Sequence, residues 1–229
     1  MRKPLQCFTA YDVRGRVPDE LNADIARRIG LAFVDRFALT RVVVGRDMRL
    51  SSPELAASLM DILTTEGVDV LDIGLAGTEE VYHAVFSGEA AGVDGGIMVT
   101  ASHNPADYNG MKLVRRGARP VSRDSGLREI ADHAGSVDWY QGKLAAQAGK
   151  ARGKRTSATD KSAYISYLLS FIQTERLAPL KLVVNAGNGC AGPVVDLLEQ
   201  QLPCTFIKLH HQPDGRFPNG VPNPLLPEK

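Results

Sequence analysis

The chain has 229 residues, enough for one large domain or two of ordinary size. Its content of 44% hydrophobic and 23% charged residues is typical of a globular protein and argues against a disordered or fibrous chain. The 27 lysines and arginines nearly balance 26 acidic residues, so the formal net charge is +1 and no bulk attraction to nucleic acid or to an anionic membrane is expected. Recognition of an anion must therefore be local.

The cysteines and the hydropathy pattern indicate the compartment. Cys7, Cys190 and Cys204 are scattered and lack the spacing of metal ligands, so we expect free thiols in a reducing environment. No segment approaches the roughly 20 apolar residues that span a bilayer. No apolar stretch of signal-peptide length follows the basic residues 1–4. Together these features predict a cytoplasmic protein.

The first 135 residues alternate between strand-like and helix-like segments. The expected strands are 42–44, 68–73, 96–100 and 111–114, and the expected helices begin near 22, 52 and 78 and cover 122–134. Asn22 and Ser52 are the expected N-caps of the first two helices, the second with Pro53 in its first turn. This alternation predicts an α/β sandwich with a largely parallel sheet and with ligands at the strand ends.

A change of composition marks residues 142–160, which are rich in Gly, Ala, Lys, Arg, Ser and Thr and have little apolar periodicity. We interpret them as an exposed linker. The alternative, that their five cations form an anion-binding patch, is less favoured because no aromatic residues interleave the charges.

A second α/β unit is expected after the linker. Its helix would bear Tyr164, Leu168, Phe171 and Ile172, and its strands would be 180–185 and 206–209. The helix between these strands completes a βαβ pattern. One pair of strands with two helices buries little apolar surface, so this second domain is expected to be incomplete.

Residues 99–112 carry the most specific pattern in the chain. A buried strand leads into Thr-Ala-Ser-His-Asn-Pro at 100–105, and Lys112 lies on the next strand. A serine beside a histidine and near a lysine fits an activated nucleophile or a phosphate carrier. From residue types alone, a polar loop with a capping serine is the more common explanation. A Ser-His hydrolase is another alternative, but the Gly-x-Ser-x-Gly elbow is missing.

The whole pattern resembles the phosphoserine loop of the α-D-phosphohexomutases. Segments similar to other motifs of that family are 8–15, 45–49, 71–74 with 78–80, 110–114, 185–189 and 213–218. The resemblance covers essentially the entire chain. Within the family it is nearest to the bacterial enzymes that interconvert mannose 6-phosphate and mannose 1-phosphate, through a bisphosphorylated sugar, for GDP-mannose synthesis.

The resemblance implies roles for particular residues. Ser102 would carry the phosphate and, through it, contact Mg²⁺. The catalytic residues would be Ser102, His103, Lys112 and Arg14, and the substrate-binding residues would be Tyr11, Arg14, Asn104 and Lys112. The alternative for Arg14 is a surface ion pair with Asp12, and for Arg46 a similar pair with Asp47. The partner would be a hexose phosphate, with no nucleic acid and no membrane.

The resemblance also implies a domain organisation. A first domain over 1–141 would hold the phosphoserine loop, and 142–160 would link it to an incomplete second domain over 161–229. The three aspartates that hold Mg²⁺ in the family would follow residue 229, and a hard divalent cation needs several oxygen ligands. We therefore expect the front part of a longer enzyme, inactive by itself. A glucose- or glucosamine-phosphate mutase and a non-catalytic sugar-phosphate-binding remnant are the alternatives.

Overall fold

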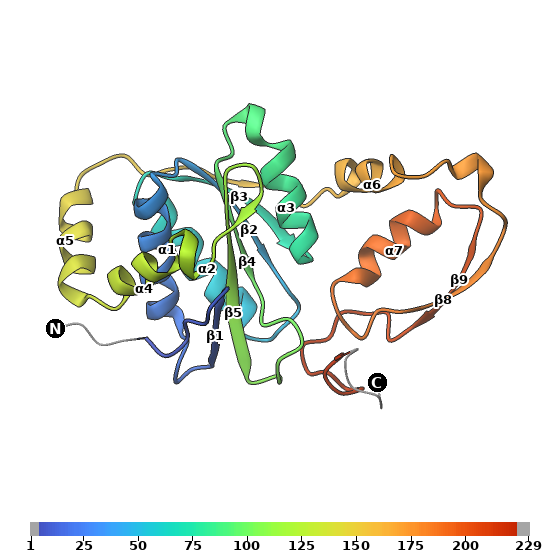
Figure 1. The fold of residues 1–229 in the computed structure, drawn as a ribbon, viewed down its shortest axis with the longest axis horizontal. Coiled ribbons are helices and arrows are strands. Elements are labelled where there is room, and N and C mark those ends of the chain that lie inside the picture. The colour runs from blue at the N-terminus through green and yellow to red at the C-terminus, as the bar shows by residue number, and fades with distance from the viewer. Residues whose placement is uncertain (1–4, 224–229) are drawn as a thin grey trace.

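The structure, a computed structural model, describes residues 5–223 as two α/β units (Figure 1). The strands of the first unit are β1 (Val13–Arg16), β2 (Arg41–Arg46), β3 (Asp69–Leu75), β4 (Gly95–Val99), β5 (Tyr108–Arg115), β6 (Arg119–Pro120) and β7 (Arg155–Ser157). Its helices are α1 (Ala23–Phe37), α2 (Ser52–Thr65), α3 (Thr78–Ser87), α4 (Leu127–Ala134) and α5 (Val137–Gln147). The second unit contains α6 (Ser162–Leu169), β8 (Lys181–Asn185), α7 (Ala191–Glu199) and β9 (Thr205–Leu209).

The sheet of the first unit has the strand order β1-β5-β4-β2-β3-β7, with β6 paired to β5. Strands β4, β2, β3 and β7 run parallel, whereas β5 is antiparallel to β1, β4 and β6. The sheet is therefore mixed, and the expectation of a largely parallel sheet is wrong for one half of it. The reason is the short connection between β4 and β5, residues 100–107, which is long enough for a hairpin but not for a crossover helix.

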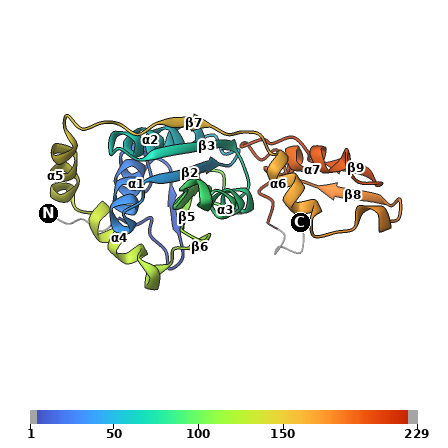
Figure 2. The same ribbon diagram turned by 90° about the horizontal axis from the view of Figure 1, so that it is seen from above.

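Helices cover both faces of this sheet. Helices α1, α2 and α4 lie on one side and α3 on the other (Figures 1 and 2). Val42 and Val44 belong to the core beneath α1 and α2, while Val43 belongs to the core beneath α3. Successive side chains of a strand point to opposite faces. A strand covered on both faces is apolar throughout, which explains the uninterrupted valine run in β2.

The N-terminal caps of the first two helices differ in how well the sequence predicted them. The side chain of Asn22 accepts a hydrogen bond from the backbone N–H of Ile25 at 3.1 Å, which confirms the expected cap of α1. The prediction of Ser52 as a cap is wrong, because Ser51 occupies the N-cap position and Ser52 is the first residue of α2. The Ser52 hydroxyl instead donates to the carboxylate of Asp47 at 2.6 Å.

The segment expected as a linker is partly ordered into the first unit. Helix α5 reaches Gln147, and β7 adds a parallel edge strand to β3. Figure 2 shows this stretch running along the first unit before it reaches the second. All three residues of β7 are exposed, so its polar sequence has no apolar periodicity that would mark it as a strand. The proposed boundaries stay a prediction, and their ends at 1–4 and 224–229 lie outside the described residues.

The second unit has a small core. Strands β8 and β9 form a parallel pair joined through α7. Among the described residues after 160, Ile165 and Phe217 are the buried hydrophobic side chains. Helix α6 ends at Leu169, so Phe171 and Ile172 follow the helix that was expected to bear them, and they are 68% and 42% exposed. No helix of the described chain is long and apolar enough to cross a membrane.

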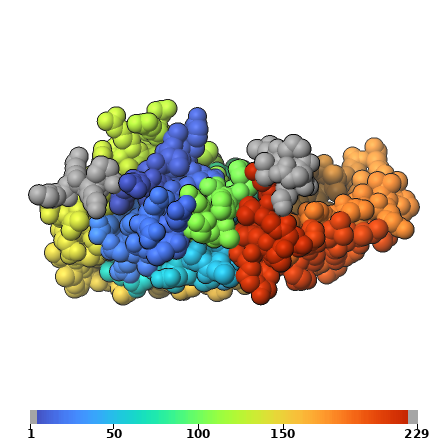
Figure 3. Space-filling view, turned by 90° about the horizontal axis from the view of Figure 1, so that it is seen from below, coloured from blue at the N-terminus to red at the C-terminus, as the bar shows by residue number. Residues whose placement is uncertain are grey.

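The end of the second unit packs against the first. In Figure 3 the red atoms of this segment lie beside the green and cyan surface of the first unit. A Cβ atom at Gly215 would overlap the backbone oxygen of Met48, so only glycine allows this approach. Beside it, the ring of Phe217 lies 5.1 Å from the guanidinium carbon of Arg49. The second unit therefore contacts the chain directly after β2.

Candidate active site

Ser102 lies on the loop between β4 and β5 and is exposed to solvent. Its backbone φ is 54°, in the left-handed region that residues other than glycine avoid at a cost of about 1–2 kcal/mol. Such a conformation persists only where neighbouring groups fix it, and outliers of this kind cluster at functional sites. The question is therefore which groups hold this loop, residues 100–107.

Arg49 contacts the loop from the interior of the protein. Its side chain is 0% exposed. One terminal nitrogen donates to the backbone oxygens of Ser102 and Asn104 at 2.9 and 2.7 Å, and the other donates to those of Pro105 and Tyr108 at 2.6 and 2.8 Å. A guanidinium is the one side chain whose planar fork can satisfy four acceptors in this way. The left-handed serine is thus fixed by a buried cation.

The charge of Arg49 is balanced by Asp47, whose Oδ2 lies 3.3 Å from the Arg49 Nε. Burial lowers the pKa of Arg49, and the adjacent Asp47 carboxylate opposes that shift. The same oxygen of Asp47 accepts a hydrogen bond from the Thr100 hydroxyl at 2.7 Å. That hydroxyl in turn accepts one from the backbone N–H of Ser102 at 2.9 Å. Because Ser52 of α2 donates to the other oxygen of Asp47, a continuous hydrogen-bond network runs from α2 to the backbone of Ser102.

Arg14 contacts the loop from the other side. One of its terminal nitrogens donates to the backbone oxygen of Ala101 at 2.7 Å and to the side-chain oxygen of Asn104. Its Nη2 pairs with Asp12 at 2.9 Å, and Lys112 lies 3.3 Å from the same carboxylate oxygen. Two cations thus share one carboxylate beside the serine loop.

The strand register explains why these two cations meet. Val13 pairs with Met111, and both side chains belong to the core beneath α1 and α2. Because side chains alternate along a strand, Arg14 and Lys112 point to the opposite face. Burial alone would raise the pKa of Asp12, but the hydrogen bonds of Arg14 and Thr9 and the charges of Arg14 and Lys112 lower it overall.

The remaining predicted residues are more loosely placed. The Nδ1 of His103 lies 3.4 Å from the Ser102 hydroxyl oxygen, and both side chains are exposed. Tyr11 is 79% exposed, so it is not packed into a pocket wall of the described chain. Of the predicted residues, the structure brings Ser102, Asn104 and Arg14 into one contact network and joins Lys112 to it through Asp12.

Arg49, Asp47 and Thr100 were not among the predicted site residues, and Asp47 was considered only as an ion-pair partner of Arg46. Asp47 pairs with Arg49 rather than with Arg46, and this pair is buried. The Arg14–Asp12 pair does form, but its side chains are only 19% and 9% exposed and Arg14 also binds the loop. The position of these residues in the sequence could have indicated them. Charged residues directly after a parallel strand lie at the carboxyl ends of the strands, where ligands bind in α/β sheets.

The residues from 5 to 223 contain no group of three or more His, Cys, Asp or Glu side chains placed to hold a metal ion. Ser102 would supply one oxygen ligand at most, whereas Mg²⁺ takes six. The described residues alone therefore do not fit a magnesium site.

The fold agrees with comparisons to known proteins. Residues 5–141 match the model of "Phosphoglucomutase/phosphomannomutase, alpha/beta/alpha domain I", and residues 162–229 match that of domain II. The chain belongs to the phosphoglucomutase/phosphomannomutase family.

Two curated relatives and one solved structure show how similar the chain is to individual proteins. The chain is 54% identical to a phosphomannomutase of Salmonella montevideo over 98% of its length, and 51% identical to one of Escherichia coli K12 over 99%. A crystal structure of a family protein from Burkholderia thailandensis superposes on the whole chain with a TM-score of 0.82 and 39% identity. These alignments cover 48%, 49% and 48% of the respective relatives, so the chain spans about half the length of the curated relatives it matches.

Proposed function

We propose that this chain supplies the phosphate-carrying part of a phosphomannomutase. In the proposed reaction, the phosphoryl group on the Ser102 oxygen passes to the free hydroxyl of mannose 1-phosphate or mannose 6-phosphate. The resulting bisphosphorylated sugar then returns its other phosphoryl group to the Ser102 oxygen, so the phosphoserine is restored and the sugar phosphate is isomerised. This reaction would feed GDP-mannose synthesis.

The left-handed conformation of Ser102 is the observation that carries this proposal. It presents the hydroxyl to solvent while the backbone on both sides is tied to Arg49 and Arg14. Phosphoryl transfer depends mainly on positioning and on stabilisation of charge. A rigid carrier serine provides the positioning, and the cations beside its loop provide part of the charge stabilisation.

The neighbouring side chains suggest their roles. Phosphoserine carries roughly −1.5 to −2 charges, and Arg14 and Lys112 together outnumber the single carboxylate of Asp12 that they share. We assign Arg14 to stabilising the phosphate and, with Asn104, to shaping the loop. Lys112, like Arg14, remains a proposed acid–base or charge-stabilising group, and His103 remains a proposed catalytic residue beside the serine. Tyr11, Asn104 and Lys112 remain proposed substrate contacts.

Further ligands must complete this site. We propose that Mg²⁺ binds the serine phosphate together with carboxylates from outside the described residues, which place no three candidate ligands together. By itself the 229-residue chain should therefore show negligible turnover. A cytoplasmic location and a hexose phosphate as the partner, without nucleic acid or membrane, stay predictions.

Mass spectrometry of a longer protein that contains this chain, after incubation with a hexose 1,6-bisphosphate, tests the proposal. We expect phosphate on Ser102 and none in the Ser102→Ala variant, with Ser122→Ala as a control that keeps the phosphate. In a longer protein that contains this chain, Ser102→Ala should abolish most conversion of mannose phosphates. Wild-type turnover in that variant would refute the assignment.

Two other functions make different predictions. Relative turnover of mannose, glucose and glucosamine phosphates distinguishes the sister mutases. A non-catalytic remnant would bind sugar phosphates without labelling of Ser102. For a Ser-His hydrolase, reaction of Ser102 with a fluorophosphonate would be required, yet the serine precedes a strand rather than the helix of a nucleophile elbow.

A further inference from the structure

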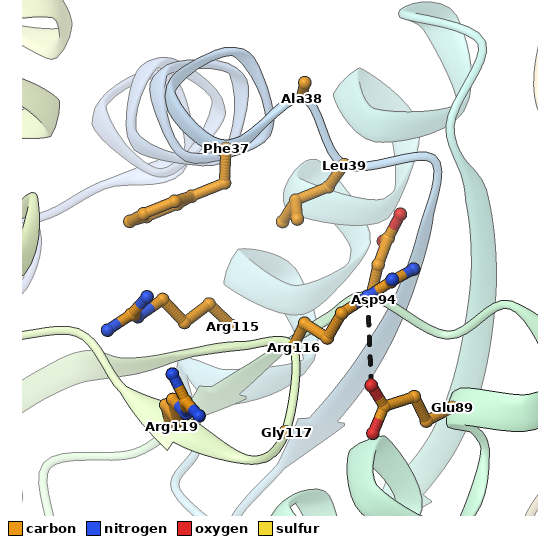
Figure 4. A pocket seen from close by; sticks show the side chains of 9 residues that line it. All are labelled: Phe37, Ala38, Leu39, Glu89, Asp94, Arg115, Arg116, Gly117 and Arg119. Carbon is orange, nitrogen blue, oxygen red and sulfur yellow. Dashed lines mark ion pairs between the residues drawn. The ribbon is translucent and has the colours of Figure 1, made fainter.

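A separate hollow lies at the far end of the same strands. Strands β4 and β5 connect it to the serine loop, because Gly95 pairs with Arg115 at one end and Val99 with Met111 at the other. The hollow has a volume of about 610 Å³, within the usual range of ligand sites. Its lining residues are Phe37, Ala38, Leu39, Glu89, Asp94, Arg115, Arg116, Gly117 and Arg119 (Figure 4). No residue of the serine-loop network lines it.

Three arginines within five residues of the sequence bring positive charge to the lining of this hollow. Figure 4 shows Arg115 extending beneath the ring of Phe37, with the Arg119 side chain below it, while Arg116 turns the other way toward Glu89. Arg116 pairs with Glu89 at 4.0 Å. Among the described residues, no carboxylate lies within ion-pair distance of Arg115 or Arg119.

The second carboxylate of the hollow is already engaged. Asp94 is 8% exposed, and its oxygens accept hydrogen bonds from the backbone and hydroxyl of Thr40 and from the backbone N–H of Arg41, at 2.9–3.1 Å. It therefore fixes the turn before β2 rather than pairing with an arginine. The part of the chain that the structure describes therefore offers no counter-charge to the guanidinium groups of Arg115 and Arg119.

The positions of Arg115 and Arg119 cost stability in the folded chain. Arg115 and Arg119 are direct partners across the antiparallel strands β5 and β6, and like charges opposite one another destabilise a sheet. In addition, the Nε of Arg115 is buried and has no hydrogen-bond partner. A buried donor without an acceptor is costly. A bound anion would relieve both costs at once.

We propose that this hollow binds the phosphate group of a small organic phosphate, at a site distinct from Ser102. A phosphate monoester carries close to two negative charges at neutral pH, matching the two unpaired guanidinium groups. Arginine binds phosphate through paired N–H donors. The half-buried ring of Phe37 and the side chain of Leu39 offer apolar contact to the carbon skeleton of the ligand.

Titration of the full chain with phenyl phosphate and with inorganic phosphate, followed by NMR of the arginine Nε–H signals, tests this site. We expect the Arg115 signal to shift and phenyl phosphate to bind more tightly than inorganic phosphate. Arg115→Gln and Arg119→Gln should each weaken binding about tenfold or more, since each removes a charge-assisted contact. Arg116→Gln is the matched control, because that side chain pairs with Glu89, and it should change binding less than threefold.

The Ser102→Ala variant separates this site from the proposed catalytic one, because it should leave binding in the hollow unchanged. Equal affinity of the wild type, Arg115→Gln and Arg119→Gln would overturn the proposal. Loss of the shift at Arg115 in Ser102→Ala would also overturn it, since the phosphate would then be binding at the serine loop.

Discussion

Replacing Arg49 with methionine tests how much of the serine loop depends on one buried side chain. The substitution keeps most of the side-chain volume but removes the donors to four backbone oxygens and the partner of Asp47. Removing one member of a buried ion pair costs about 3–5 kcal/mol. Asp47 keeps hydrogen bonds from Ser52 and Thr100, so we expect the lower end, about 3 kcal/mol.

The sequence provides a convenient probe for this measurement. Trp139 is the single tryptophan of the chain and stacks on His133, with ring centroids 4.7 Å apart, within the first unit. Its fluorescence during urea unfolding therefore reports on that unit alone. A loss of about 3 kcal/mol is a large share of the 5–15 kcal/mol by which domains are stable, so the midpoint should fall visibly.

Arg46→Met is the matched control, since it makes the same change three residues earlier on a side chain that contributes no ion pair described above. We expect it to cost less than about 1 kcal/mol. Arg49→Lys should recover only part of the loss, because an ammonium cannot reach four acceptors in the plane of a fork. A loss below about 1 kcal/mol in Arg49→Met would refute the view that Arg49 fixes the loop.

Three further outcomes are expected. Gly110→Ala should destabilise the first unit by at least about 2 kcal/mol, because its Cβ would overlap a backbone oxygen of β1, whereas Gly142→Ala in α5 has open space and should stabilise by about 0.5–1 kcal/mol. The folded pKa of Asp12 is lowered, so its contribution is complete above its ordinary pKa near 4 and is lost as the pH falls through the folded value; stability should therefore fall less steeply between pH 5 and 2 in Asp12→Asn than in the wild type. Burial, with the nearby charge of Asp47, raises the pKa of Cys190 to about 12, so this thiol should resist labelling at pH 8.

A specific result would contradict each of these three predictions. Urea midpoints that move alike in the two glycine variants would show that the close contact between β1 and β5 is unimportant. Parallel pH curves for the wild type and Asp12→Asn would show that this carboxylate does not titrate differently in the folded state. Rapid labelling of Cys190 in the native chain would show that its thiol is not shielded by the contact with Met48.

Local patterns in the sequence determined most of the elements. The N-cap Asn22 and the valine run of β2 follow rules that act over a few residues, and the structure has both where they were expected. The serine loop was also visible in the sequence, because its motif is contiguous.

The tertiary structure decided the features that depend on pairing across the chain. The direction of β5 and the addition of β7 depend on which strands become neighbours, and nothing in the local composition of 155–157 indicates an edge strand. The network below Ser102 joins residues 47, 49 and 100 with residue 217 of the second unit. Buried arginine is rare, so a single sequence gives no reason to place Arg49 inside the protein. Its position follows from four backbone oxygens, turned inward by the loop, that no apolar side chain could satisfy.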